Sequence, residues 1–80
     1  MPTYSLYFYP SCYYCRLVLQ AIDAKGLDVE LRDIHQDPKW REELAAARGR
    51  TTVPVLRIDT DEQSQWMPES RDIVKFLASL

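Results

Sequence analysis

The sequence has only two cysteines, a single histidine and no long hydrophobic run. The two cysteines lie three positions apart, whereas small secreted domains usually spread four or more along the chain, so a disulfide framework is excluded. The longest uncharged run, Met1–Cys15, is rich in tyrosine and interrupted by prolines. It cannot form a membrane-spanning helix of about 20 apolar residues, and it lacks the basic start of a secretory signal. We therefore expect a cytoplasmic protein with no membrane contact.

The charged residues also form no basic surface. Ten Lys and Arg residues oppose twelve Asp and Glu, which gives a net charge of −2, and the basic residues are scattered. Proteins that bind nucleic acid normally gather their basic residues on one face, so no nucleic-acid partner is expected. The hydrophobic share of 46% and the charged share of 28% are typical of a globular protein. We expect residues 1–80 to form one domain.

Hydrophobic periodicity predicts four strands and three helices. The predicted strands are Tyr4–Tyr9, Val29–Arg32, Thr52–Ile58 and Gln65–Met67. The first helix follows Ser11 and closes at Lys25–Gly26, and the second runs from Asp37–Pro38 to Gly49. The third follows Glu69–Ser70, with Ser70 as its N-cap and an apolar face of Ile73, Phe76, Leu77 and Leu80.

The element order β-α-β-α-β-β-α predicts an α/β fold with a mixed four-stranded sheet flanked by helices. A helix between the first two strands favours parallel pairing, and the short turn between the last two requires antiparallel pairing. The first strand is apolar on both faces, which is typical of a strand covered on both sides. The aromatic residues expected to serve in packing are Tyr4, Tyr7, Tyr9, Trp40 and Trp66.

Cys12 and Cys15 stand where a buried strand ends and a helix begins. The N–H groups at a helix N-terminus stabilise negative charge, and the thiolate is the reactive form of cysteine. Cys15 lies about one turn further along the same side of the helix, within reach of a mixed disulfide on Cys12. This arrangement predicts Cys12 as the attacking thiol and Cys15 as the resolving one. Tyr14, between them, is expected to line a substrate groove.

Other interpretations of the cysteine pair are weaker. A structural zinc site needs four ligands, and the chain offers two cysteines and one histidine, so no metal site is assigned. The two thiols could instead be inert and buried. His35 follows the second predicted strand in a polar segment and is interpreted as a solvated loop residue, because titration near neutral pH alone proves nothing.

Three segments in order resemble the glutaredoxins, over essentially the whole chain. Tyr9–Cys15 is similar to their active-site stretch, and Thr52-Val53-Pro54 matches the Thr-Val-Pro that precedes their third strand, where the proline is cis. Met67–Val74 is closer to the glutaredoxin-2 type and to the amino-terminal domain of glutathione transferases. In those proteins the pair that corresponds to Glu69-Ser70 holds the γ-glutamyl end of glutathione. The resemblance implies a thioredoxin-like fold.

The resemblance also implies glutathione-dependent reduction of protein–glutathione mixed disulfides and of protein disulfides by a monomeric enzyme. Glutathione is then a co-substrate, and no tightly bound cofactor is expected. The implied glutathione-binding residues are Tyr14, Thr52, Val53, Pro54, Glu69 and Ser70. An extended backbone before Pro54 suits a peptide-like ligand, although Pro54 could be an ordinary strand-start proline and Glu69-Ser70 simply a helix cap.

The chain departs from the family pattern at two positions. Tyr13 replaces the proline that follows the first cysteine in most dithiol glutaredoxins, and no lysine precedes Cys12. Glutaredoxin-2 and transferase chains also continue into a helical second domain. Two alternative functions therefore stay open: a module that binds a [2Fe–2S] cluster through the first cysteine and glutathione, and a transferase-like glutathione-binding domain.

Overall fold

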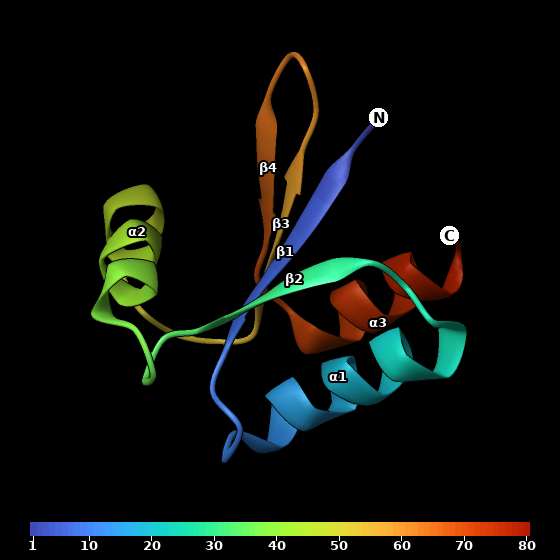
Figure 1. The fold of residues 1–80 in the computed structure, drawn as a ribbon, viewed down its shortest axis with the longest axis horizontal. Coiled ribbons are helices and arrows are strands. Elements are labelled where there is room, and N and C mark those ends of the chain that lie inside the picture. Colours follow the sequence, from blue (N-terminus) through green and yellow to red (C-terminus); the bar gives the residue numbers. More distant parts are fainter.

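The computed structural model describes residues 1–80, and its centre is a four-stranded sheet (Figure 1). The strands are β1 (Thr3–Phe8), β2 (Val29–Asp33), β3 (Val55–Asp59) and β4 (Ser64–Met67). The helices are α1 (Tyr13–Lys25), α2 (Pro38–Arg48) and α3 (Ser70–Ala78). The predicted element order and the mixed sheet are confirmed. No helix is long and apolar enough to cross a membrane.

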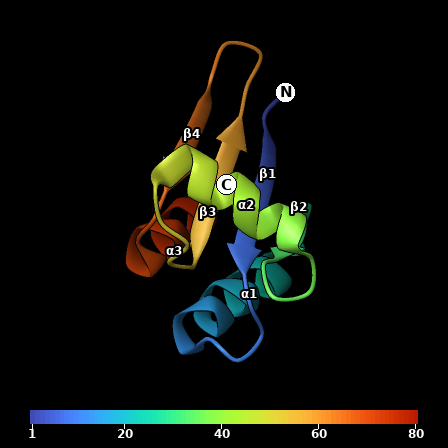
Figure 2. The same ribbon diagram turned by 90° about the vertical axis from the view of Figure 1, so that its left-hand side faces the viewer.

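The strands lie in the order β2-β1-β3-β4. β1 and β2 are parallel and are joined through α1, whereas the β1–β3 and β3–β4 pairs are antiparallel. Helices α1 and α3 lie side by side on one face of the sheet, and α2 lies alone on the other (Figures 1 and 2). The C-terminal end of β1 therefore delivers the chain directly to the start of α1, where the cysteine pair lies.

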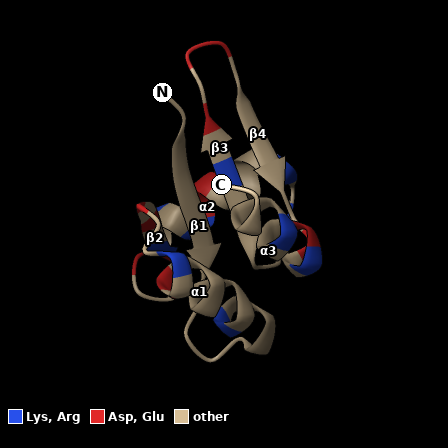
Figure 3. Cartoon of the chain, turned by 90° about the vertical axis from the view of Figure 1, so that its right-hand side faces the viewer, with Lys and Arg blue, Asp and Glu red and all other residues tan.

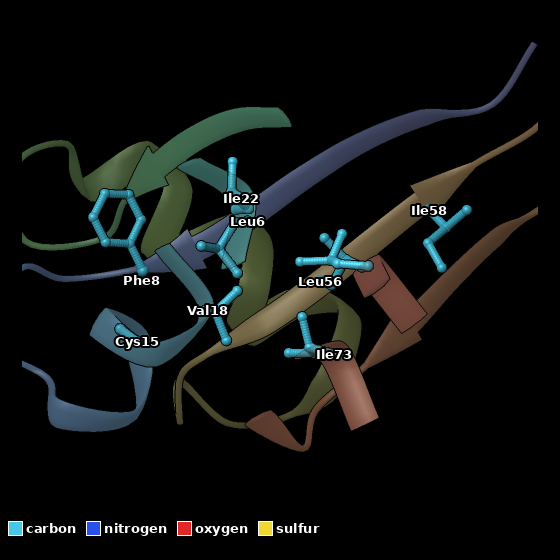
Figure 4. Packing of buried hydrophobic residues seen from close by; sticks show 9 residues of the cluster. Leu6, Phe8, Cys15, Val18, Ile22, Leu56, Ile58 and Ile73 are labelled. Atoms are coloured by element: carbon cyan, nitrogen blue, oxygen red, sulfur yellow. The ribbon is translucent and has the colours of Figure 1, made fainter. Parts of the chain in front are cut away.

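Alternating residues of β1 contribute to both hydrophobic cores, which explains why apolar or aromatic side chains occur on both faces of this strand. Leu6 and Phe8 pack toward α1 and α3, whereas Tyr7 packs toward Leu44 of α2. The larger core comprises Leu6, Phe8, Cys15, Val18, Ile22, Leu56, Ile58, Ile73 and Leu77 (Figure 4). Cys15 thus belongs to the core itself.

Local sequence signals set most helix ends. The side chain of Asp37 accepts a hydrogen bond from the Lys39 N–H at 3.0 Å, as expected for an N-cap. Gly26 and Gly49 end α1 and α2 in the left-handed conformation, with φ of 60° and 72°, which a residue without Cβ adopts without strain.

A polar cluster joins α2 to the sheet. The buried Tyr7 hydroxyl donates to a carboxylate oxygen of Glu43 on α2 and accepts from Arg32 at 2.7 Å. The same Glu43 oxygen forms ion pairs with Arg32 at 2.7 Å and with Arg57 at 3.3 Å. Tyr7 was correctly predicted as a packing residue, but the sequence did not reveal its polar partners. These contacts and the buried Leu44 hold α2 against the sheet.

The structure corrects three details of the sequence-based prediction. β3 begins at Val55, which pairs with Tyr7, and not at Thr52, because Pro54 has no N–H to donate to the ladder. The N-cap of α3 is Glu69, not Ser70, and no side chain caps this helix end. Leu80, expected on the apolar face of α3, is 45% exposed because the helix ends at Ala78.

Candidate active site

Cys12 occupies the N-cap position of α1. Its φ and ψ of −80° and 122° are extended, and its N–H donates to the Tyr9 carbonyl at 3.1 Å, which closes the turn after β1. The Cys12 Sγ accepts a hydrogen bond from the Cys15 N–H at 3.3 Å. The sulfur is partly exposed and lies where the helix dipole and an N–H donor favour negative charge. This geometry suits Cys12 for nucleophilic attack.

The environment of Cys15 differs from that of Cys12 in burial and in its effect on the thiol pKa. Its side chain is fully buried and belongs to the larger core. Burial, then the hydrogen bond with Cys12 and the charges of Cys12 and Asp33, together raise the pKa of Cys15 to about 12. Cys15 is therefore a neutral thiol near pH 7. Both cysteines are free thiols, and the geometry separates an accessible sulfur from a shielded one.

A groove of about 850 Å³ opens beside the cysteine pair, between α1, the segment before β3 and the start of α3. Five of the residues predicted to bind glutathione line it: Tyr14, Val53, Pro54, Glu69 and Ser70. They come from three separate parts of the chain, and the fold brings them together. The Val53–Pro54 peptide bond is cis, as the resemblance implied.

The main chain of Val53 forms no hydrogen bond within the molecule, although the side chain is only partly exposed. Backbone N–H and C=O groups at partly buried positions normally find partners. An extended, peptide-like ligand in the groove could supply both. Val53 therefore presents an edge of unpaired main chain directly before Pro54.

The groove carries charges of both signs on its α3 side. Glu69 is exposed, and its carboxylate makes no hydrogen bond or ion pair. Arg71 and Asp72 follow on the first turn of α3. An anionic group near this helix start would also meet unpaired N–H groups. The chemistry of this end suits a ligand that carries both an ammonium and a carboxylate.

Five further residues line this groove that were not predicted from the sequence. Leu17, Pro68, Arg71, Asp72 and Val74 also line the groove. Leu17 lies three residues after Tyr14, so helical spacing could have identified it. The others lie on either side of Glu69-Ser70, around the start of α3.

Thr52 lies outside this groove. It lines a neighbouring depression of about 690 Å³ together with Tyr9, His35 and Arg41, and Val53 is shared by both. His35 is exposed in the β2–α2 loop, as predicted, with its ring stacked on Tyr9 at 4.1 Å. No group of three or more His, Cys, Asp or Glu side chains is arranged to hold a metal ion.

The β-α-β-α-β-β-α fold, with a Cys-x-x-Cys pair at the first helix and a cis proline before the third strand, defines a thioredoxin-like protein. Comparison with known families is more specific. The model for the glutathione S-transferase N-terminal domain matches residues 6–80, and the chain belongs to this family.

A match to a glutaredoxin is consistent with the resemblance described above. The chain is 35% identical over 75 residues to glutaredoxin 2 of Escherichia coli K12, an alignment that covers 94% of this chain and 33% of the relative. The chain thus spans about a third of the length of that protein.

Solved structures show the same fold. A maleylacetoacetate isomerase from Anaeromyxobacter dehalogenans, described with bound dicarboxyethyl glutathione and citrate, is 28% identical with a TM-score of 0.74. That match covers 98% of this chain and 36% of the isomerase. A glutathione transferase Omega 2S from Trametes versicolor, 18% identical with a TM-score of 0.75, covers 99% and 36% and supports the fold alone.

Proposed function

We propose that this chain is a glutathione-dependent thiol–disulfide oxidoreductase of the glutaredoxin type. The observation that carries the proposal is the position of Cys12: a partly exposed sulfur at a helix N-terminus, hydrogen-bonded to the Cys15 N–H at 3.3 Å. The adjoining groove offers Val53 main chain and the Glu69 carboxylate to a peptide-like ligand. Glutaredoxin 2 among the relatives supports this activity, and the glutathione derivative bound by the related isomerase supports the ligand.

The reaction begins at the glutathione sulfur of a mixed disulfide. The Cys12 thiolate attacks this sulfur, a new S–S bond forms, and the substrate thiolate leaves and takes up a proton. A second glutathione thiolate then attacks the same glutathione sulfur. Glutathione disulfide is released and the Cys12 thiolate is restored, so that the sulfur of the second glutathione is oxidised and the substrate sulfur is reduced to a thiol.

Reduction of a protein disulfide needs Cys15. Cys12 first forms a mixed disulfide with one substrate sulfur, and the Cys15 thiolate then attacks Cys12 Sγ and releases the reduced substrate. Burial keeps the pKa of Cys15 high. The hydrogen bond and charge of Cys12, which also raise it, disappear once Cys12 is in a disulfide. We propose that the loss of these two contributions to its pKa lets Cys15 resolve the intermediate, and that the chain works in a reducing compartment such as the cytoplasm.

The groove supplies the binding energy for glutathione. The Val53 main chain pairs with the peptide part of glutathione, in the manner of an added strand. Glu69 accepts from the γ-glutamyl ammonium, and the N–H groups at the start of α3 with the Ser70 hydroxyl receive its carboxylate. Tyr14 and Pro54 form the apolar sides between these ends.

The experiment is a glutathione-coupled assay with the mixed disulfide of glutathione and 2-mercaptoethanol. Wild type is expected to turn over, Cys12→Ser to lose all activity, and Cys15→Ser to retain much of it. Cys15→Ser should nevertheless fail to reduce a protein disulfide. Full activity in Cys12→Ser would contradict the assignment of the nucleophile.

A transferase function is the second candidate, because the chain belongs to the family of glutathione S-transferase N-terminal domains. In that case glutathione's own sulfur attacks an electrophile, and neither cysteine of the chain is consumed. Binding of glutathione without reduction of the small mixed disulfide, and conjugation to an aryl halide that survives Cys12→Ser, would favour this function.

A further inference from the structure

Two exposed tyrosines stand directly after the proposed nucleophile. Tyr13 is 65% and Tyr14 58% exposed, and their rings meet edge to face with centroids 5.3 Å apart. Exposed aromatic pairs of this kind offer a large, rigid contact area to a partner. Only Tyr14 lines the groove; Tyr13 lines neither of the two depressions that flank the site. Tyr13 therefore presents its ring to something other than a ligand in the groove.

The geometry of disulfide exchange indicates what that partner is. This inference rests on the proposed function, in which the glutathione half of a mixed disulfide lies in the groove. The leaving sulfur then lies two S–S bonds, or about 4 Å, from Cys12 Sγ. The residues next to the leaving cysteine are therefore brought close to the start of α1, where Tyr13 directly follows Cys12.

The charge at this position is basic. Arg16 follows Tyr13 by three residues, which places the two side chains next to each other on the helix surface. Arg16 is exposed and takes part in no ion pair, and the first turn of α1 contains no acidic residue. The acidic turn between β3 and β4 lies at the opposite end of the molecule (Figure 3).

We propose that Tyr13 and Arg16 form a docking face for the protein half of the substrate. The face selects glutathionylated segments in which an aromatic residue and an acidic residue flank the modified cysteine. The aromatic side chain packs on the Tyr13 ring, and the carboxylate pairs with the Arg16 guanidinium. Tyr13 stands where most dithiol glutaredoxins have proline, so this selectivity is built into the active-site sequence itself.

The test compares three glutathionylated pentapeptides that are identical except at the two residues that flank the cysteine. Their central three residues are Phe-Cys-Glu, Ser-Cys-Glu and Phe-Cys-Lys. For wild type, kcat/KM for Phe-Cys-Glu should exceed that for Ser-Cys-Glu about threefold to tenfold. It should exceed that for Phe-Cys-Lys about twofold to fivefold. Tyr13→Ala should bring the first ratio to about 1, and Arg16→Glu should reverse the second.

Two variants serve as matched controls for these ratios. Leu31→Ala removes a half-exposed apolar side chain on β2, and Lys75→Glu reverses an exposed charge on α3. Both should keep the wild-type ratios. Equal kcat/KM for the three peptides in wild type, or an unchanged Phe/Ser ratio in Tyr13→Ala, would overturn the docking face. Wild type is also assayed with the small mixed disulfide: failure there overturns the proposed function, whereas turnover without discrimination between the peptides overturns this inference alone.

Discussion

Cys12 and Cys15 have the same side chain, but the fold gives them different chemistry. The first is partly exposed at a helix N-terminus, and the second is fully buried in the core. Burial, then the neighbouring Cys12, raises the pKa of Cys15 to about 12. At pH 8 its thiolate fraction is therefore on the order of one in ten thousand. The division of roles between attacking and resolving sulfur follows from this difference.

We expect iodoacetamide to modify Cys12 but not Cys15 of the folded, reduced chain at pH 8, because only the thiolate reacts and only Cys12 is accessible. Both cysteines should react in denaturant. Peptide mapping by mass spectrometry after timed alkylation measures this. Equal rates at the two cysteines in the folded chain would show that the environment does not shield Cys15.

The same raised pKa predicts how stability changes with pH. The folded state holds the Cys15 proton more tightly than the unfolded state, whose cysteine pKa is about 8.5. The contribution of Cys15 is therefore fully present below pH 8.5 and is lost as pH rises toward 12. Urea unfolding between pH 8 and 10.5 should show a steeper fall of the free energy of unfolding in wild type than in Cys15→Ser. Parallel curves would contradict the raised pKa.

A substitution of Glu69 tests whether the α3 side of the groove binds glutathione. Replacing it with alanine should raise the KM for glutathione about tenfold, the lower end of what a charged hydrogen bond contributes, because the side chain is exposed. The rate of Cys12 alkylation should stay unchanged. Glu62→Ala, an exposed acid in the distant β3–β4 turn, is the control. A wild-type KM in Glu69→Ala would mean that Glu69 only starts a helix.

Individual residues differ in how far the sequence could reveal them. Cys12 and Cys15 were identified by spacing and by the strand before them, because their chemistry depends on local structure. The partners of the Tyr7 hydroxyl were not identified, because Glu43 lies 36 residues away and its contact with Tyr7 depends on how α2 packs. Tertiary packing, which no local pattern encodes, decides such contacts.

The elements differ in how their ends are held. α2 has a side-chain cap at Asp37, whereas the start of α3 has none although Ser70 was expected to provide it. A capping residue must lie just outside the first turn, and Ser70 lies one position inside. A shift of one residue is below the precision of sequence patterns, so this end could not be fixed from the sequence alone.

Alanine substitutions at the starts of α2 and α3 should therefore lower the free energy of unfolding by different amounts. Asp37→Ala should lower the free energy of unfolding by about 1 kcal/mol, or Tm by about 4–8 °C, because an N-cap bond is lost. Ser70→Ala should lower it by less than about 0.5 kcal/mol, because no cap bond exists. Thermal unfolding monitored by circular dichroism measures both. Equal losses would contradict the assignment of Glu69 as N-cap.

The polar cluster between α2 and the sheet predicts a second effect on the free energy of unfolding. Glu43→Gln should lower the free energy of unfolding by about 1 kcal/mol, since Glu43 accepts from Tyr7 and pairs with two arginines while remaining partly exposed. Glu42→Gln removes an exposed neighbouring charge that has no partner and should change stability little. Similar losses in the two variants would show that the cluster does not hold α2.

For the whole molecule, the groove exists only because three distant segments meet. About 40 residues separate the start of α1 from the Val53–Pro54 segment, and about 16 separate that segment from the start of α3. The antiparallel β1–β3 pairing brings the three segments to one end. The sequence predicted five of the ten lining residues, mainly through its resemblance to glutaredoxins. Spacing alone could not have joined them, because the sheet order that unites them is set by long-range pairing.

Trapping the intermediate tests whether Cys12 is the sulfur that receives glutathione. The reduced Cys15→Ser variant is incubated with glutathione disulfide and its mass is measured, followed by peptide mapping. One glutathione per chain, attached at Cys12, is the predicted result, because attack by Cys12 releases one glutathione thiol and no second cysteine can resolve the adduct. Cys12→Ser should stay unmodified under the same conditions. An unmodified Cys15→Ser variant, or an adduct at Cys15 in Cys12→Ser, would contradict the account.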